Sequence, residues 1–303
     1  MIRREPGAVH GAARPLAFLD VLQPGPYASV QDLGRPGLGA LGVGMSGACD
    51  RSSLRLANRL LGNPEGAAAV EVTAGGLVLR TGGDVLVAVT GAPAPVFVDE
   101  RPAPASAPVA LPAGAVLRLG LPGRGLRTYV AVRGGLTVGA TLGSRSTDVL
   151  AGLGPAALQA GQRLPVGRPA GAWNPVDIAP VELDGSDPRW LRIRVGPRED
   201  RFTAAALVTL RSASYEVTSA SNRVGLRLAG PRLEFDTNEE LPSEGMVPGA
   251  LQVPPSGLPT LLLADHPVTG GYPVIAVVVD DDLDAAGQTR PGQRLRFRVV
   301  GQG

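Results

Sequence analysis

The 303-residue sequence contains no lysine, and all 29 of its basic residues are arginine. A Walker-type phosphate loop needs a lysine on the nucleotide phosphates, so this chain is not a P-loop ATPase. Schiff-base chemistry and a pyridoxal-phosphate aldimine are excluded as well, because each needs a lysine amine. Biotin is carried as an amide of a lysine side chain. The chain therefore cannot be its own biotin carrier.

Other features are also scarce. Aromatic residues make up 4% of the chain and its formal net charge is +2, which argues against nucleic acid and anionic membrane as partners. The single Cys49 allows no internal disulfide and no cysteine cluster for zinc, so we expect a cytoplasmic protein. No apolar run approaches the ~20 residues of a membrane span. The arginine-containing start lacks a signal-peptide core, and we expect residues 1–16 to be a disordered extension.

Short β-rich runs separated by 42 glycines and 29 prolines dominate the rest of the sequence. This pattern predicts a mainly β fold, a barrel or sandwich, with few helices. The expected strands are Val85–Val89, Tyr129–Val132, Leu191–Val195, Leu226–Leu228, Leu261–Ala264, Val274–Val279 and Leu295–Val299. A short motif, a glycine-containing turn followed by an apolar strand start, recurs in 111–117, 158–164 and 289–295. It is either a common turn type or a sign of two related β-domains.

Two segments predict helices, and one predicts a linker. Asp50 as N-cap and Gly62 as the stop bound the first helix, and 201–210 shows helical spacing for the second. The segment 169–188 is rich in Gly, Pro and Asp, and we place the linker there. It separates an N-terminal β subdomain, 17–168, from a C-terminal β subdomain, 189–303.

The stretch 262–273, Leu-Leu-Ala-Asp-His-Pro-Val-Thr-Gly-Gly-Tyr-Pro, is the strongest candidate for chemistry. It follows an apolar run with a carboxylate, an imidazole, a hydroxyl and two glycines. His266 is the only histidine outside the N-terminal extension, and imidazole titrates near neutral pH. The same residues also suit a plain turn, and the residue types alone do not separate the two interpretations.

Three further clusters concentrate polar groups near predicted turns. They are 31–37 continuing to 46–50, then 143–148, and then 221–225 with 243–245 and 249–254. In the first, an Asp32–Arg35 ion pair bracing a loop is the alternative to a binding site. In the second, the alternative to a binding site is that Asp148 simply caps a short helix. In the third, Glu244 and Asp265 could form a carboxylate pair around His266.

Other site chemistries fit poorly. No Gly-x-Ser-x-Gly elbow accompanies His266, and Cys49 has no protease context. One histidine with scattered carboxylates does not predict a metal site.

These motifs in their order resemble one family over about 19–299. The matching segments are Gln31–Arg35, Ser46–Asp50, Leu56–Asn58, Gly62–Asn63, Thr90–Ala92, Gly143–Asp148, Ser243–Gly245 and Gln252–Pro273. The sequence resembles the allophanate hydrolase subunit 2 family, also described as the carboxyltransferase A/B-subdomain family. That family includes Kip-type kinase-inhibitor antagonists and the C subunits of bacterial 5-oxoprolinases, and it is similar to part of the urea carboxylase carboxyltransferase domain.

The resemblance implies two cyclophilin-like, β-barrel-like subdomains and a hetero-oligomer with a subunit 1/B partner, with a third subunit in the 5-oxoprolinase members. It implies an ATP-dependent hydrolase that opens the lactam of 5-oxoproline to glutamate, with ATP bound somewhere in the complex. One alternative is a biotin-dependent carboxyltransferase of the urea type, with biotin on another chain. A second is a non-enzymatic antagonist of a sensor-kinase inhibitor.

The site hypothesis follows from these motifs. We expect His266, Asp265 and Glu244 to be catalytic, with Asp265 orienting His266 and with the backbone N–H groups of Gly270 and Gly271 stabilising a carbonyl oxygen. The expected substrate-binding residues are Gln31, Asp32, Arg35, Ser46, Asp50, Arg145, Asp148, Arg223, Gln252, Thr269, Gly270, Gly271 and Tyr272; Arg145 and Arg223 would hold anionic groups. Two positions depart from the family pattern: Cys49, where many relatives have methionine, and Val274, where many have lysine.

Overall fold

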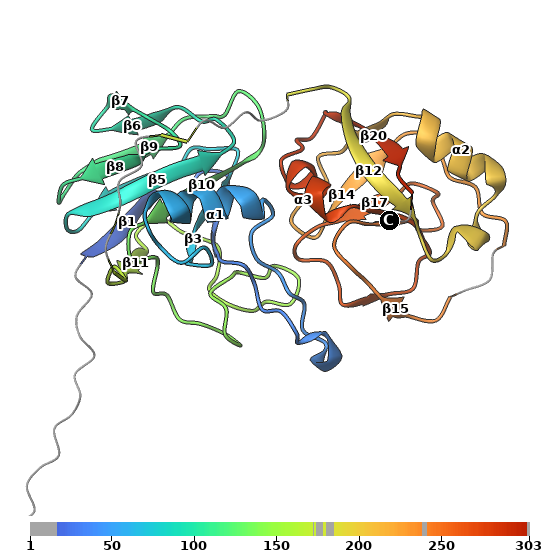
Figure 1. Ribbon diagram of the computed structural model, residues 1–303, viewed down its shortest axis with the longest axis horizontal. Coiled ribbons are helices and arrows are strands. Elements are labelled where there is room, and N and C mark those ends of the chain that lie inside the picture. The colour runs from blue at the N-terminus through green and yellow to red at the C-terminus, as the bar shows by residue number, and fades with distance from the viewer. Residues whose placement is uncertain (1–16, 172, 174–177, 180–184, 238–240, 302–303) are drawn as a thin grey trace, which may run out of the picture.

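A computed structural model describes residues 17–171, 173, 178–179, 185–237 and 241–301. The expected extension 1–16 and much of the expected linker lie outside these residues. Figure 1 shows two groups of strands side by side, β1–β11 in the N-terminal half and β12–β20 in the C-terminal half. The mainly β prediction is confirmed.

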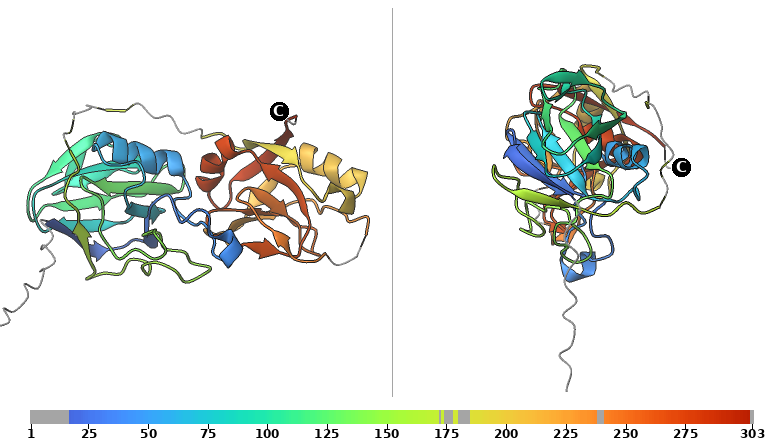
Figure 2. Two further views of the ribbon diagram at one scale, coloured as in Figure 1. Left: turned by 60° about the horizontal axis from the view of Figure 1, so that its bottom comes forward. Right: turned by 90° about the vertical axis from the view of Figure 1, so that its left-hand side faces the viewer.

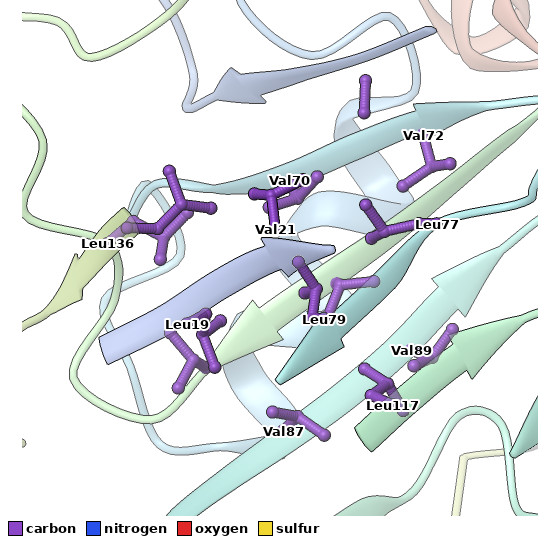
Figure 3. Packing of buried hydrophobic residues seen from close by; sticks show 14 of the residues in the cluster. Leu19, Val21, Val70, Val72, Leu77, Leu79, Val87, Val89, Leu117 and Leu136 are labelled. Atoms are coloured by element: carbon purple, nitrogen blue, oxygen red, sulfur yellow. The ribbon is translucent and has the colours of Figure 1, made fainter. Parts of the chain in front are cut away.

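The N-terminal half contains two sheets. One has the order β11-β1-β4-β9-β6-β7 and the other has the order β2-β3-β10-β5-β8. The strands are β1 Ala17–Gln23, β2 Tyr27–Gln31, β3 Ala69–Thr73, β4 Val78–Thr81, β5 Val85–Gly91, β6 Val96–Val98, β7 Arg101–Ala103, β8 Pro108–Leu111, β9 Val116–Leu119, β10 Arg127–Val132 and β11 Arg163–Val166. Aliphatic side chains of both sheets, including Leu19, Val70, Val87 and Leu117, share one core (Figure 3).

The C-terminal half forms a closed barrel in the order β12-β19-β16-β17-β14-β13-β20, beside a two-stranded sheet β15-β18. The strands are β12 Arg189–Val195, β13 Tyr215–Val217, β14 Gly225–Ala229, β15 Glu244–Gly245, β16 Ala250–Gln252, β17 Thr260–Leu262, β18 Thr269–Gly270, β19 Val274–Val278 and β20 Arg294–Val299. Leu191, Ile193, Leu251, Ile275 and Phe297 fill the barrel. Closure pairs every strand of this sheet on both sides.

The helix α1, Arg51–Leu60, covers the outer face of the five-stranded sheet. Asp50 is its N-cap and accepts a hydrogen bond from Ser53 N at 2.9 Å, as predicted. Small residues of the sheet, Ala88 and Ala131, lie under the buried Leu54 of α1 and let the helix approach closely. Because the core covers its other face, every residue of β10 is buried.

The other helices differ from the predicted ones in bounds or number. The second predicted helix is a 3-10 turn, η2 Glu199–Arg201, followed by α2 Ala204–Ser212, because Thr203 is the N-cap and accepts from Ala206 N. Two helical segments were not predicted: α3, Asp280–Gly287, and the short η1, Gly39–Leu41. Figures 1 and 2 place α3 on the side of the barrel nearest the N-terminal half. Within the described ranges, none of the helices combines the length and apolar character of a bilayer span.

The recurring turn motif has one conformation in all three places. Gly114, Gly161 and Gly292 adopt φ of 85°, 86° and 85°, in the left-handed region that favours glycine. In each case the next residue's N–H donates to the carbonyl three positions earlier. Two copies lead into strands of the N-terminal half and one into a strand of the barrel, as expected for a turn that precedes a strand.

Candidate functional site

A buried network of charges lies where the two halves meet, and Arg223 is at its centre. Its Nε and Nη2 donate to both oxygens of Asp265, at 2.9 and 3.0 Å. Its Nη1 donates to Glu71 of the N-terminal half, and its Nη2 also reaches the carbonyl of Gly47 at 2.6 Å. Arg223, Asp265 and Glu71 are all buried, and Arg223 is only 3% exposed. Nη1 also lies 3.4 Å from Cys49 Sγ, so all five N–H donors of this guanidinium are directed at the protein itself.

Glu71 is held by further donors from the N-terminal half. Its Oε2 accepts from Cys49 N at 2.9 Å and from Tyr129 Oη at 2.7 Å, and Arg127 Nε lies 3.5 Å from its Oε1. Burial acts to raise the pKa of Glu71, but Arg223 and Arg127 outweigh it and the pKa lies below its ordinary value. The positive charges of Arg223 and Arg127 thus balance the negative charges of Glu71 and Asp265. This balance offsets the cost of burying these charged groups.

Asp265 extends this network into the loops of the N-terminal half. Its Oδ1 accepts from Ser46 Oγ at 2.6 Å and its Oδ2 from Val149 N at 3.1 Å. Ser46 Oγ also lies 3.2 Å from the carbonyl of Thr147. The strand-end loop after β17 is therefore fixed against two N-terminal loops, and this contact sets the position of His266.

Asp265 does not orient His266 through a hydrogen bond as expected, because its oxygens accept from Arg223, Ser46 and Val149. Nδ1 of His266 instead lies 2.8 Å from the carbonyl oxygen of Pro267. A carbonyl oxygen only accepts, so Nδ1 carries the proton and Nε2 keeps the lone pair in the neutral ring. Burial lowers the pKa of His266, opposed by the Pro267 hydrogen bond and by the charges of Asp265 and Asp148.

A pocket of about 490 Å³ opens beside His266. Asp148, Thr269 and Leu150 line it together with the glycine-containing loop 39–44. Gly270 and Gly271, expected to supply backbone N–H groups, do not border it; Gly270 pairs with Glu244 across β15-β18, and Gly271 is exposed. The pocket therefore combines one imidazole, one carboxylate and one hydroxyl with largely apolar and backbone walls.

The first two predicted clusters meet at Asp32. Its Oδ1 accepts from Ser144 Oγ and Ser146 Oγ, both at 2.6 Å, and from Gly34 N at 2.8 Å. Its Oδ2 accepts from Arg145 N at 2.6 Å. The carboxylate is thereby committed to the protein, so it holds loop 144–148 in place and is not a substrate-binding group.

Arg35 pairs with Asp148 and not with Asp32, contrary to the expected ion pair. Its Nη1 lies 3.8 Å from Asp148 Oδ2, and its Nη2 donates to the carbonyl of Ser146 at 2.6 Å. Within the described part of the chain, Nε and Nη1 of this buried side chain have no hydrogen-bond partner. Asp148 Oδ1 accepts from Leu150 N and Ala151 N, at 3.0 and 2.9 Å. Arg35 thus supplies positive charge behind the pocket wall.

The expected pair of Glu244 with Asp265 does not form, because Glu244 binds Arg198, whose Nε lies 2.9 Å away. Several other expected binding residues have structural partners. Gln31 Nε2 donates to Ser29 and Thr147, and Gln252 Nε2 donates to the carbonyl of Tyr272. Asp50 caps α1 and accepts from Gln288. The side chain of Arg145 is half-buried. Tyr272 is 50% exposed, and Thr269 is at the pocket.

Four residues of the network were not predicted: Glu71, Arg127, Tyr129 and Gln288. The position of Glu71 did carry a signal, because this residue interrupts the apolar run of β3 and a charge there needs a partner. Gln288 follows α3, and its Oε1 accepts from Leu126 N and Arg127 N, both at 2.9 Å. No group of three or more possible ligands among the described residues could hold a metal ion.

Comparisons with known proteins agree with this architecture. Residues 41–299 match the family described as carboxyltransferase domain, subdomain A and B. The chain is 36% identical to the C subunit of 5-oxoprolinase from Escherichia coli, over 92% of this chain and 90% of the relative. It is 35% identical to the C subunit of 5-oxoprolinase from Haemophilus influenzae, over 93% and 91%.

A solved structure is also similar. The crystal structure of K. lactis urea amidolyase superposes with a TM-score of 0.87 at 28% identity, covering 96% of this chain and 19% of that one. The family match covers most of the chain. It includes the motifs at 143–148 and 252–273 and part of the motif at 31–50. The chain belongs to the carboxyltransferase domain family with subdomains A and B.

Proposed function

We propose that this chain is a subunit of an ATP-dependent 5-oxoprolinase-type amidohydrolase, which opens the lactam of 5-oxoproline to glutamate. The supporting observation is the end-to-end similarity to the C subunits of two 5-oxoprolinases, which covers nine-tenths of each protein. By contrast, the chain corresponds to only 19% of the urea amidolyase chain. A match over whole subunits favours the same kind of subunit here.

The pocket beside His266 suits chemistry on an amide. The lone pair at Nε2 can take a proton from an attacking water, and the imidazolium can return it to the ring nitrogen as the C–N bond breaks. Because the pKa of His266 is lowered, the ring is neutral at pH 7 and ready to act as a base. Asp148, at the same pocket, stabilises the imidazolium that forms in between.

The pocket does not fit ATP. Among the described residues that line it there is no arginine, and Asp148 would repel a triphosphate. ATP supplies the free energy for opening a stable lactam, and we assign its binding to a partner. The subunit 1/B homologue and a third subunit are the expected partners, which makes the protein a hetero-oligomer.

A second candidate function is carboxyl transfer to urea or a related amide, with biotin carried on another chain. The family description and the likeness to urea amidolyase favour it. The same histidine would then move the proton of the accepting amide nitrogen.

One reconstitution separates these functions. The chain would be purified with its subunit 1/B homologue and the third subunit, and glutamate release from 5-oxoproline with ATP would be measured with and without this chain. Release that requires the chain supports the proposal. Carboxylation of urea from carboxybiotin without glutamate release would support the second candidate. Tight partner binding with neither activity would point to the non-enzymatic antagonist.

A further inference from the structure

A second hollow, the α1/α3 groove, is lined by Leu263 and Ala264, which come just before Asp265 in the chain. It has a volume of about 760 Å³, within the range of small-molecule sites, and runs between α1 of the N-terminal half and α3 of the barrel half. Figures 1 and 2 show α3 on the barrel side nearest the N-terminal half. The residues that line the groove are all different from those that line the pocket of the proposed hydrolysis.

The α1 wall of the groove is cationic. Arg51 and Arg55, one turn apart, both line it. Arg55 and Arg59 share the carboxylate of Glu65, at 3.5 and 3.0 Å, and the buried Nε of Arg55 has no hydrogen-bond partner in the described part of the chain. Three guanidiniums on successive turns therefore have one carboxylate between them.

Arg51 is the unpaired member of this set. Among the residues that the structure describes, its guanidinium hydrogen-bonds only to Met45, with Nη2 at 3.4 Å from Sδ, and forms no ion pair. Burial, and then repulsion from Arg55, lowers the pKa of Arg51. A half-buried guanidinium next to a like charge is stabilised when an anion binds it.

The α3 wall is acidic. Asp280, Asp281 and Asp284 line the groove from the first turns of α3. Asp284 is committed to α1, accepting from Arg51 N at 2.7 Å and Ser52 N at 3.1 Å, and Asp281 lies 3.5 Å from Arg192. Within the described ranges, the side chain of Asp280 makes no hydrogen bond or ion pair. It acts on Arg51 only through its charge.

Charge and shape together define the ligand. A free phosphate or dicarboxylate would be attracted to Arg51 but repelled by the aspartates across the groove. A molecule with a carboxylate and an ammonium group satisfies both walls. Leu263, Val277 and Pro248 also line the groove and provide apolar surface for a hydrocarbon side chain. We propose that the α1/α3 groove binds a free α-amino acid with an apolar side chain, its carboxylate on Arg51 and Arg55 and its ammonium group on Asp280.

The test uses the full chain, alone and in complex with its partners, and three probes measured by calorimetry. L-Leucine carries both charges, N-acetyl-L-leucine only the carboxylate, and L-leucinamide only the ammonium group. We expect leucine to bind at least tenfold more tightly than either blocked compound. Arg51→Gln and Asp280→Asn should each weaken leucine binding at least tenfold, whereas Arg59→Gln, on the same helix but outside the groove, should not.

Control measurements separate this proposal from the hydrolase function. His266→Ala should lower hydrolysis by at least about a hundredfold and leave leucine binding intact, so the two proposals fail independently. Thermal unfolding of each variant without ligand shows whether it is folded. Equal binding of leucine and N-acetyl-leucine would overturn the proposal. So would the absence of leucine binding to the folded wild-type protein at concentrations well above a Kd of ~1 mM.

Discussion

Arg223 and Glu71, 152 positions apart in the sequence, form a buried ion pair between the two halves of the molecule. The same guanidinium binds Asp265, the residue immediately before His266. A contact between the halves thereby fixes the backbone that carries the proposed proton-transfer group. Stability and activity are expected to depend on the same few buried charges.

Glu71→Gln tests the stabilising role of this network. The change leaves Arg223 and Arg127 buried beside a neutral amide, and breaking a buried pair in this way destabilises a protein by ~3–5 kcal/mol. We expect a loss of that size in the free energy of unfolding measured with urea. Glu100→Gln, which removes the exposed partner of Arg118, is the matched control and should leave stability unchanged. Equal stability of the two variants would contradict the role of Glu71.

Asp50 should make stability depend on pH. Burial, followed by repulsion from Asp284, raises its pKa to about 6 from 3.8. A raised pKa means that the folded state binds the proton more tightly, so this stabilisation is complete below pH 3.8 and is lost as pH rises to about 6. The shift of about two units corresponds to ~3 kcal/mol.

Urea unfolding of the wild-type protein and of Asp50→Asn between about pH 4 and pH 7 measures this effect. Asparagine is also a good N-cap, so α1 is preserved. The stability of the wild-type protein relative to the variant should fall by ~3 kcal/mol as pH rises across this range. A difference that is constant with pH would show that Asp50 does not titrate there.

Asp32→Asn should loosen the loop 144–148. The two carboxylate oxygens together accept four hydrogen bonds, from Gly34, Ser144, Arg145 and Ser146. In asparagine an NH₂ group replaces one of these oxygens, and it cannot accept the hydrogen bonds made there. Unsatisfied buried donors destabilise by ~1–3 kcal/mol. Hydrogen exchange should rise selectively in 144–148. Asp84→Asn is the control and should leave it unchanged, because the amide oxygen can still accept the exposed hydrogen bond from Ala113 N. Unaltered exchange in Asp32→Asn would contradict the proposed role of this carboxylate.

The pH profile of the assembled enzyme should show an acid limb from His266. Because its pKa is lowered from 6.5, the base form is lost and kcat/KM falls only below that pH. The charge of Asp148 raises the pKa of His266, so Asp148→Asn should move the limb to lower pH. A limb that moves to higher pH, or that persists unchanged in a His266 variant, would assign it to another group.

Much of the fold could be predicted from local patterns. All seven expected strands correspond to strands, and Asp50 and Gly62 located α1 because capping is a local interaction. The predicted start of α2 at 201 was too early because Thr203 provides the cap. The helix α3 was missed because Val279, its N-cap residue, has no capping side chain.

The site was harder to predict, since its partners depend on tertiary contacts. Polar density marked loops 31–50 and 143–148, and these do meet through Asp32 and Ser144. Which carboxylate meets which arginine was not encoded locally: Arg35 pairs with Asp148, and Glu244 pairs with Arg198. Glu71 was an overlooked sign of this network, because a carboxylate inside a buried strand requires a cation from another part of the chain.

His266→Ala in the reconstituted complex is the most direct measurement of the proposed chemistry. Positioned proton transfer contributes ~10²–10⁴-fold to rate, so kcat for glutamate release should fall by at least about a hundredfold while the complex still assembles. Size-exclusion chromatography of the variant complex provides the control for assembly. A loss of less than tenfold in an intact complex would contradict a catalytic role for His266.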